Sequence, residues 1–165
     1  MIILGLDPGT AITGYGLIDA EAGGYSLIGY GCIRTEAGQS DHLRLLKIYN
    51  DLCILLEAAK PEQVAVEKLF FNRNITTAVP VAQARGVLLL TCAQRNLPLR
   101  EYTPLEVKQA LTGYGRADKK QIQYMVCRLL KMAETPQPDD AADALAIAIT
   151  HAHYYRNLQK WEGKS

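Results

Sequence analysis

Four acidic side chains are placed where a folded chain could bring them together. Asp7 closes a short apolar run near the start of the chain, and Glu67 closes a second β-favouring run. Asp140 and Asp143 are three residues apart in a predicted helix, and residues with this spacing share one helix face. If the four carboxylates converge, each pair about 4 Å apart repels by roughly 4 kcal/mol at an effective dielectric constant of 20. Only protons or cations relieve that repulsion.

The chemistry that such a cluster favours is metal-assisted hydrolysis. Carboxylate-rich sites with oxygen ligands suit Mg²⁺ or Mn²⁺. Two such ions, about 3.5 to 4 Å apart, can activate a water and stabilise the leaving oxygen of an in-line phosphoryl displacement. The acids therefore predict phosphodiester hydrolysis. Taken singly, each has a structural alternative: Asp7 can cap the turn that follows it, and Asp140 can be a stabilising charge in a first helical turn.

Helix geometry sets apart three neighbouring residues that could also bind a metal. Asp139 is turned about 100° from Asp140, which makes it the weaker candidate for the cluster. His151 and His153 are separated by roughly 200° around a helix, so they do not form the metal-facing pair of an i, i+4 motif. One of them could still lie near the last acid, but we interpret both histidines as structural.

The elements that must position the acids alternate between strands and helices. Short apolar runs that end in turn residues predict strands, and apolar positions recurring every 3.6 residues predict helices. Pro80 falls in the first turn of its predicted helix, and Ser40 is placed to cap the first helix. The predicted strands are Ile2–Leu6, Tyr15–Asp19, Tyr25–Thr35, Val64–Glu67 and Leu99–Tyr102. The predicted helices run from Ser40 to before Pro61, and over Thr77–Arg95, Pro104–Leu111, Asp118–Lys131 and Pro138–Tyr154.

This order of elements predicts an α/β fold with a mixed five-stranded sheet flanked by helices. In such sheets, reactive groups gather at strand ends and at adjacent helix termini. The chain has 165 residues, about the length of one domain, and we find no repeat or linker that would divide residues 1–165.

The composition is that of a globular protein with an uneven charge distribution. Hydrophobic residues make up 48% of the chain and charged ones 21%, which excludes a disordered or low-complexity chain. The net charge is +1, yet residues 68–131 hold 11 basic and 3 acidic side chains. Such a segment can form a cationic surface for a polyanion, or it can simply be solvated.

Cysteine usage and hydropathy predict a soluble cytoplasmic protein with no membrane association. The four cysteines are far apart with no CxxC pair, which indicates buried thiols in a reducing compartment. The N-terminus has no basic region and reaches an acid at Asp7, unlike a signal peptide. The longest apolar run, Val87–Ala93, is far short of the ~20 residues that cross a bilayer.

The acids also lie within motifs that occur together in one family. The motif-bearing segments are Ile3–Thr10, Thr13–Gly16, Val66–Glu67, Gln83–Gly86 and Asp140–Ala148. With these motifs in this order, the sequence resembles the RuvC family of bacterial Holliday junction resolvases from Met1 to about His153. The Asp-Ala-Ala-Asp-Ala-Leu match selects Asp140, and not Asp139, as the family's third acid.

The resemblance implies both the fold and the function. It implies a ribonuclease H-like fold in a homodimer that resolves Holliday junctions by symmetric hydrolysis of opposed strands, with 5′-phosphate products, in recombination and DNA repair. It also implies Mg²⁺, with Mn²⁺ able to substitute, two ions per active site, and action alongside RuvA and RuvB. The residues that match the family's four catalytic, metal-binding acids are Asp7, Glu67, Asp140 and Asp143.

Candidate DNA contacts follow from the same resemblance. Phe70 matches a position at which similar resolvases present an aromatic ring to junction bases, although Phe70 and Phe71 could instead both lie in the core. Lys108 and Lys119 align with lysines placed close to the scissile phosphate. Lys120 and Arg116 could hold the DNA backbone or simply be solvated.

The predicted helix over Thr77–Arg95 bears on the dimer. It is apolar over more than one face, so one face can cover the sheet and another can meet a second subunit. A two-fold dimer suits a four-way junction, which needs two opposed cuts. A monomer with a deeply buried helix is the alternative. Pro80 departs from the family's usual residues here.

Three other functions compete with this interpretation. Resolvase-like ribonucleases that trim ribosomal RNA precursors open with a similar motif, but the Asp140–Ala148 segment and the chain length favour the junction enzyme. Sugar kinases and actin-like ATPases need a duplicated domain, for which 165 residues are too few. A non-catalytic junction-binding subunit would be indicated by the loss of an acid, and none is lost.

Overall fold

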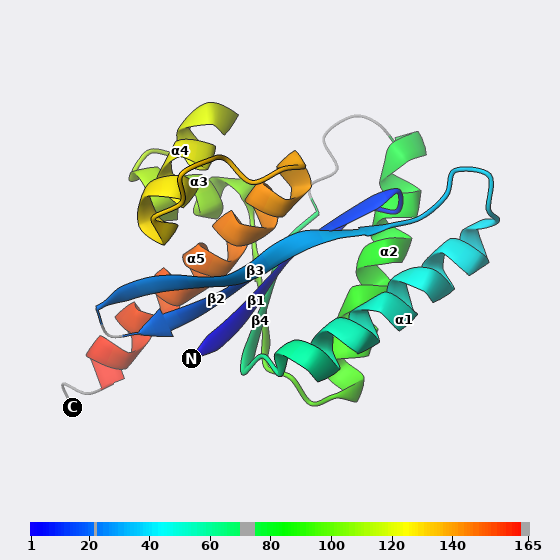
Figure 1. The fold of residues 1–165 in the computed structure, drawn as a ribbon, viewed down its shortest axis with the longest axis horizontal. Helices are drawn as coiled ribbons and strands as arrows, with labels where there is room; N and C mark the ends of the chain where they lie inside the picture. Colours follow the sequence, from blue (N-terminus) through cyan, green and yellow to red (C-terminus); the bar gives the residue numbers. More distant parts are fainter. Residues whose placement is uncertain (22, 70–74, 163–165) are drawn as a thin grey trace.

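A computed structural model describes residues 1–21, 23–69 and 75–162 and places five strands in one mixed sheet (Figure 1). The strand order is β3-β2-β1-β4-β5. β1, β2 and β3 pair as antiparallel neighbours, whereas β4 runs parallel to β1 and β5 runs parallel to β4. This confirms the predicted mixed five-stranded sheet. The strands are β1 (Ile2–Asp7), β2 (Ile12–Glu21), β3 (Gly24–Arg34), β4 (Gln63–Glu67) and β5 (Leu99–Tyr102).

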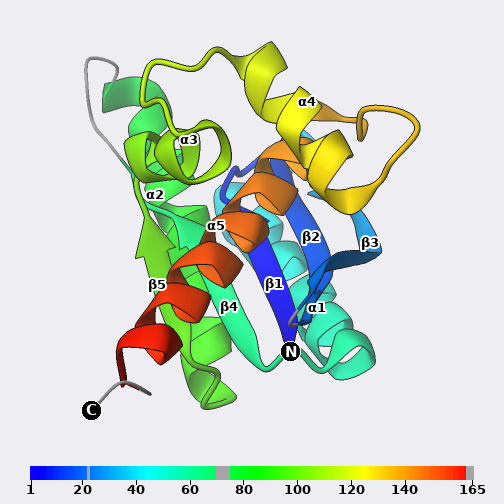
Figure 2. The same ribbon diagram turned by 90° about the vertical axis from the view of Figure 1, so that its left-hand side faces the viewer.

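Helices cover both faces of the sheet. Figures 1 and 2 show α1 and α2 on one face and α5 on the other, with α3 and α4 on the side of α5. Because successive strand residues point to opposite faces, Leu4 and Leu6 pack under α1 and α2 while Ile3 packs under α5. The helices are α1 (Asp41–Ala59), α2 (Ile75–Gln94), α3 (Pro104–Thr112), α4 (Lys119–Leu130) and α5 (Asp139–Glu162).

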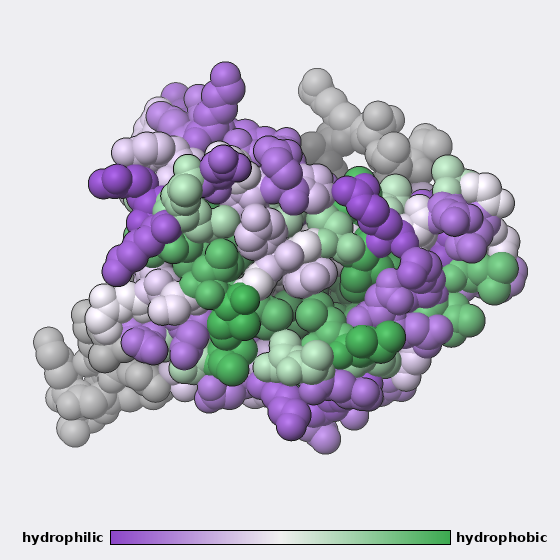
Figure 3. Space-filling model, in the orientation of Figure 1, coloured by the Kyte–Doolittle hydropathy of each residue, from purple (hydrophilic) through white to green (hydrophobic). Residues whose placement is uncertain are grey.

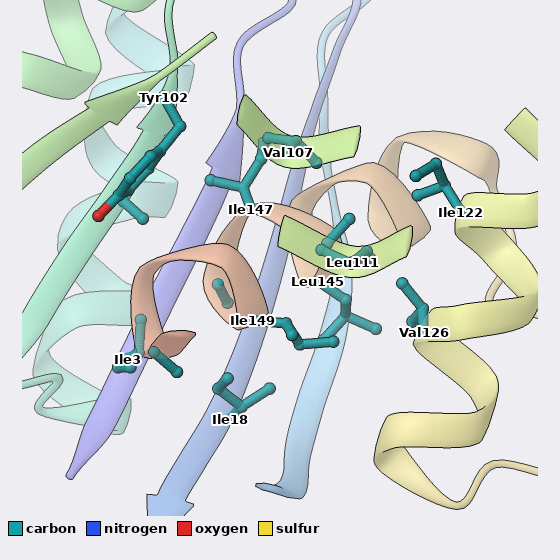
Figure 4. Packing of buried hydrophobic residues seen from close by; sticks show 14 of the residues in the cluster. Ile3, Ile18, Tyr102, Val107, Leu111, Ile122, Val126, Leu145, Ile147 and Ile149 are labelled. Atoms are coloured by element: carbon teal, nitrogen blue, oxygen red, sulfur yellow. The ribbon is translucent and has the colours of Figure 1, made fainter. Parts of the chain in front are cut away.

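The long C-terminal helix α5 lies directly against the middle of the sheet. Leu145, Ile147 and Ile149 of α5 pack in one buried cluster with Ile3 and Ile18 of the strands (Figure 4). Two glycines of the N-terminal motif make this close approach possible. A Cβ atom at Gly5 would overlap the Ala144 carbonyl oxygen, and one at Gly14 would overlap the Asp140 carbonyl oxygen. Side chains at these two positions would push the start of α5 off the sheet.

Several predicted boundaries differ from the structure. α2 begins at Ile75, so Pro80 lies inside the helix and not in its first turn. The carbonyl of Pro80 accepts a hydrogen bond from Thr10 Oγ1 at 2.6 Å, which ties α2 to the loop after β1. Ser40 stands at the N-cap of α1 as predicted, but its side chain makes no capping bond. The helix predicted to extend through Tyr154 continues to Glu162.

The cysteine prediction is confirmed in one respect and wrong in another. All four cysteines are free thiols. Cys92 is buried, but Cys32, Cys53 and Cys127 are only partly buried. They lie on elements whose outer sides meet solvent, which apolar neighbours in the sequence do not reveal. Within the part of the chain that the structure describes, no helix combines the length and the apolar character that crossing a membrane requires.

Candidate active site

Asp7 and Glu67 end adjacent parallel strands and face the same helix. Asp7 is the last residue of β1, and it is in phase with Ile3 and Gly5, which face α5. Glu67 is the last residue of β4, two residues after Ala65, which also packs under α5. The register of β1 and β4 therefore brings the two carboxylates to one edge of the sheet.

The first turns of α5 bring Asp140 and Asp143 to the same edge. Asp7 pairs with Gly14 across β1 and β2, and the backbone of Asp140 rests against Gly14. In Figure 2, β1 runs upward from the N-terminus toward the start of α5. Asp143 is one helical turn further on and half-buried, and its charge acts on both Asp7 and Glu67. The structure thus brings the four predicted acids together from three separate segments.

The electrostatics of the site show how crowded these carboxylates are. Burial, followed by the negative charges of Glu67, Asp143 and Asp140, raises the pKa of Asp7 to about 8. Burial and then the charge of Asp143 raise the pKa of Glu67. Burial also raises the pKa of Asp143, against the opposing effect of the Lys119 ammonium. Repulsion between these buried carboxylates is unfavourable, and a bound proton or cation would relieve it.

The four acids fit a divalent cation by their chemistry. In the described ranges, no three His, Cys, Asp or Glu side chains stand close enough together to enclose a metal ion as they are. The acids nevertheless supply hard oxygen ligands at a point of excess negative charge, which is what Mg²⁺ and Mn²⁺ prefer. One positive side chain already pairs with this negative charge: the Lys119 ammonium lies 3.2 Å from Asp143 Oδ2.

Two of the predicted basic residues lie beside the acids. Lys108 of α3 and Lys119 of α4 line a cavity of about 190 Å³ together with Glu67 and Asp143. A phosphate that entered this cavity would have carboxylates on one side and ammonium groups on another. Both lysines therefore lie close to two of the four acids.

The other predicted DNA contacts lie elsewhere. Lys120 is exposed and lines a second cavity of about 450 Å³, which also includes the exposed rings of Tyr114 and Tyr124. Arg116 is exposed in the connection between α3 and α4. Phe70 lies outside the described residues.

The threonines of the N-terminal motif hold the loop behind Asp7. Thr13 Oγ1 donates to the carbonyl of Gly9 at 2.7 Å, and Thr10 is anchored to α2. Thr35, which follows the end of β3, donates from its Oγ1 to the Thr10 carbonyl at 2.7 Å. These bonds fix the chain that leaves β1, and with it the position of Asp7.

Asp139 has a role that sequence reasoning missed. Its charge raises the pKa of Asp143, and its Oδ2 lies 3.1 Å from the Lys119 ammonium. Its Oδ1 accepts a hydrogen bond from Gln123 Nε2 at 3.1 Å. No pattern in the sequence predicts this contact, because it depends on how the starts of α4 and α5 pack together.

The two histidines contact different partners, in agreement with the structural interpretation. His151 is buried, and its Nδ1 lies 2.9 Å from the hydroxyl of Tyr102. His153 Nδ1 lies 3.0 Å from the carbonyl of Ala110, so this nitrogen carries the proton and donates. Each ring joins α5 to a different neighbouring element.

Comparison with known proteins decides the family. The family model described as "Crossover junction endodeoxyribonuclease RuvC" matches residues 3–151. The chain belongs to the RuvC family. A protein of Syntrophomonas wolfei subsp. wolfei with the same description is 56% identical over 156 residues, which is 94% of this chain and 91% of that protein.

Solved RuvC structures agree in fold. The chain is similar to Thermus thermophilus RuvC, with a TM-score of 0.88 and 36% identity over 94% of this chain and 96% of that one. It is also similar to T. thermophilus RuvC in complex with a Holliday junction substrate, with a TM-score of 0.87, 34% identity and the same coverage. The fold is ribonuclease H-like, as the sequence resemblance implied. RuvC nucleases are metal-dependent hydrolases.

Proposed function

We propose that this chain resolves four-way DNA junctions by hydrolysing phosphodiester bonds in two opposed strands during recombination and DNA repair. The observation that carries the proposal is the meeting of four carboxylates, from β1, β4 and α5, beside two lysines. The RuvC relative solved with a Holliday junction supports the choice of substrate. The products are 5′-phosphate ends, and the enzyme works with the RuvA and RuvB branch-migration complex.

The acids that hold the metal ions in this proposal are Asp7, Glu67, Asp140 and Asp143. The ions are Mg²⁺, which Mn²⁺ can replace, with two per active site. When bound, such ions activate a water and stabilise the leaving oxygen of an in-line displacement. The protein's part is to keep these carboxylates converged on a rigid strand edge, where their mutual repulsion favours cation binding.

The basic residues bind and orient the DNA. Lys108 and Lys119 place ammonium groups in the cavity beside Glu67 and Asp143, where they can neutralise charge that develops on the scissile phosphate. Lys120 and Arg116, both exposed, hold the backbone of an adjoining strand. Phe70 stacks on a junction base, an interaction worth about 1 to 3 kcal/mol for any base.

Two active sites are supplied by a homodimer. Exposed apolar side chains on the outer sides of α1 and α2 support an interface there, since Leu46, Ile54, Val79 and Leu90 are each more than half exposed. Figure 3 shows hydrophobic surface on the side of the molecule where these helices lie. A two-fold interface would place two sites symmetrically on a junction.

Residues 1–165 act in this proposal as one nuclease domain in the cytoplasm. The presence of four free thiols supports a reducing compartment. The mixed sheet and the two buried clusters on its faces support a single folding unit.

Cleavage of a synthetic mobile four-way junction, beside a linear duplex of the same sequence and a structured RNA, tests the proposed function. With Mg²⁺ present, we expect symmetric nicks in the junction and none in the duplex, and a chelator should abolish the nicks. Trimming of the RNA without junction cleavage would instead indicate a ribonuclease. Tight junction binding without any cleavage would indicate a non-catalytic subunit.

A further inference from the structure

The ammonium group of Lys119 is shared by two aspartates of α5. Its Nζ lies 3.1 Å from Asp139 Oδ2 and 3.2 Å from Asp143 Oδ2. Gln123 follows Lys119 by one turn on the same face of α4 and donates to the other oxygen of Asp139. Asp139 is therefore bound through both of its oxygens to α4.

The position of Lys119 in its own helix is unfavourable without these partners. Lys119 is the first residue of α4, where the helix dipole disfavours a positive charge. Asp139 is the first residue of α5, where the dipole favours a negative charge. The contact between them compensates Lys119 and holds it at the mouth of the cavity that it lines with Glu67 and Asp143.

The two aspartates differ in what else they can do. Asp143 is part of the acidic cluster, and its charge raises the pKa of both Asp7 and Glu67. Asp139 is 52% exposed, and its charge raises the pKa of Asp143 but not that of Asp7 or Glu67. A metal ion held by Asp143 would compete with Lys119 for that carboxylate, and Asp139 would then be the partner that remains.

We propose that Asp139 is a positioning residue that holds Lys119 beside the active site and remains as its partner when Asp143 binds a metal ion. This inference rests on the proposed function for its effect on cleavage. Loss of the Asp139 side chain leaves Lys119 paired with Asp143, so the lysine competes with the metal ion for that carboxylate. The exposed pair itself contributes little to stability, because surface ion pairs are worth about 0 to 1 kcal/mol.

The test is a double-mutant cycle of Asp139→Ala and Lys119→Ala, read first by Mn²⁺ binding to the DNA-free protein. With Lys119 present, we expect Asp139→Ala to raise the Mn²⁺ dissociation constant about three- to tenfold. In the Lys119→Ala background, the same substitution should change it by less than about twofold. The matched control is Asp51→Ala, which removes a carboxylate from an exposed lysine pair on α1 (Lys47 Nζ to Asp51 Oδ2, 2.7 Å) and should change nothing.

The second reading is single-turnover cleavage of the four-way junction over a range of Mg²⁺ concentrations. Asp139→Ala should shift the Mg²⁺ midpoint upward by a similar factor, while the dissociation constant for the junction stays within about twofold. Asp139→Glu should have a Mg²⁺ midpoint closer to that of wild type, because it returns a carboxylate to Lys119. A purely structural role would alter stability or junction binding and leave the metal midpoint unchanged.

Three results would overturn the inference. Equal effects of Asp139→Ala with and without Lys119 would mean that Asp139 acts on the metal directly, and no effect in either background would mean that it positions nothing. If the Mn²⁺ cycle gives the expected coupling but the wild-type protein does not cut the junction, the proposed function fails and the positioning role stands. A wild-type protein that neither binds Mn²⁺ nor cuts the junction would overturn both.

Discussion

The two faces of the sheet differ in how closely their helices approach the strands. Under α1 and α2, large aliphatic residues such as Ile48 and Leu52 fill the space between helix and strand. Under α5, large residues such as Leu145 and Ile147 also pack in the core, but the closest contacts with the strands are made at small residues. Six alanines of α5 are buried, namely Ala141, Ala142, Ala144, Ala146, Ala148 and Ala152.

This difference explains where the chemistry lies. Large side chains hold a helix away from the sheet, whereas alanines and the motif glycines let α5 lie close to β1 and β2. The close contact brings Asp140 and Asp143 to the strand ends that carry Asp7 and Glu67, at the cost of burying acidic groups together. The face under α5 therefore serves both core packing and a crowded, charged site.

Packing under α1 and α2 should contribute to stability without affecting cleavage. Leu52 is fully buried, and Leu52→Ala should destabilise the protein by about 2 to 5 kcal/mol through lost burial and the cavity that remains. The single-turnover cleavage rate of the folded fraction should stay at the wild-type level. Chemical denaturation measures the loss, with Leu46→Ala, at a half-exposed position on the same helix, as the control. A cleavage defect in folded Leu52→Ala would show that the two faces are not separable.

The α5 face should instead be sensitive to added atoms. Gly14→Ala would place a methyl group against the Asp140 carbonyl and should cost about 1 to 3 kcal/mol by overpacking. It should also slow cleavage, since it displaces the first turn of α5. The matched substitution is Gly29→Ala on β3, where an added Cβ meets no atom within 4 Å. Equal effects of the two substitutions on stability and cleavage would contradict the close-packing argument.

A smaller, pH-dependent difference is expected from His151. Burial, followed by the charge of Arg100, lowers the pKa of His151 to about 4. A base with a lowered folded-state pKa contributes stability above its unfolded pKa near 6.5, and that contribution falls away as the pH drops toward 4. The difference in the free energy of unfolding between wild type and His151→Gln should therefore become smaller by roughly 1 to 2 kcal/mol from pH 7 to pH 5. Denaturation of both proteins at several pH values measures the gap, and a constant gap would mean that His151 titrates normally.

The sequence predicted the fold and the acids because both depend on local patterns. Short apolar runs that end in turn residues predicted the strands, and they placed Asp7 and Glu67 at the ends of two of them. The i, i+3 spacing of Asp140 and Asp143 holds in any helix. The family motifs then related segments that are far apart in the chain.

What the sequence did not predict depends on contacts between elements. The pairing of Asp139 with Lys119 requires the starts of α4 and α5 to lie side by side. The sequence of either helix alone does not predict that arrangement. The start of α2 was misplaced because Pro80 is tolerated inside the helix. The partial burial of Cys32, Cys53 and Cys127 likewise depends on which side of each element faces solvent.

The central claim is that the buried acids serve metal-dependent cleavage at the expense of stability, and Asp7→Asn tests it most directly. Because the raised pKa of Asp7 penalises the folded state above about pH 4, the metal-free variant at pH 7 should be more stable than wild type by at least about 1 kcal/mol. That gain should shrink as the pH falls toward 4.

The same variant should bind a four-way junction as tightly as wild type but cut it at least about a thousandfold more slowly in Mg²⁺. Stability, junction affinity and single-turnover cleavage measured on one preparation give all three values. Cleavage at the wild-type rate, or a loss of several kcal/mol of stability, would contradict the assignment of Asp7 to metal-dependent cleavage.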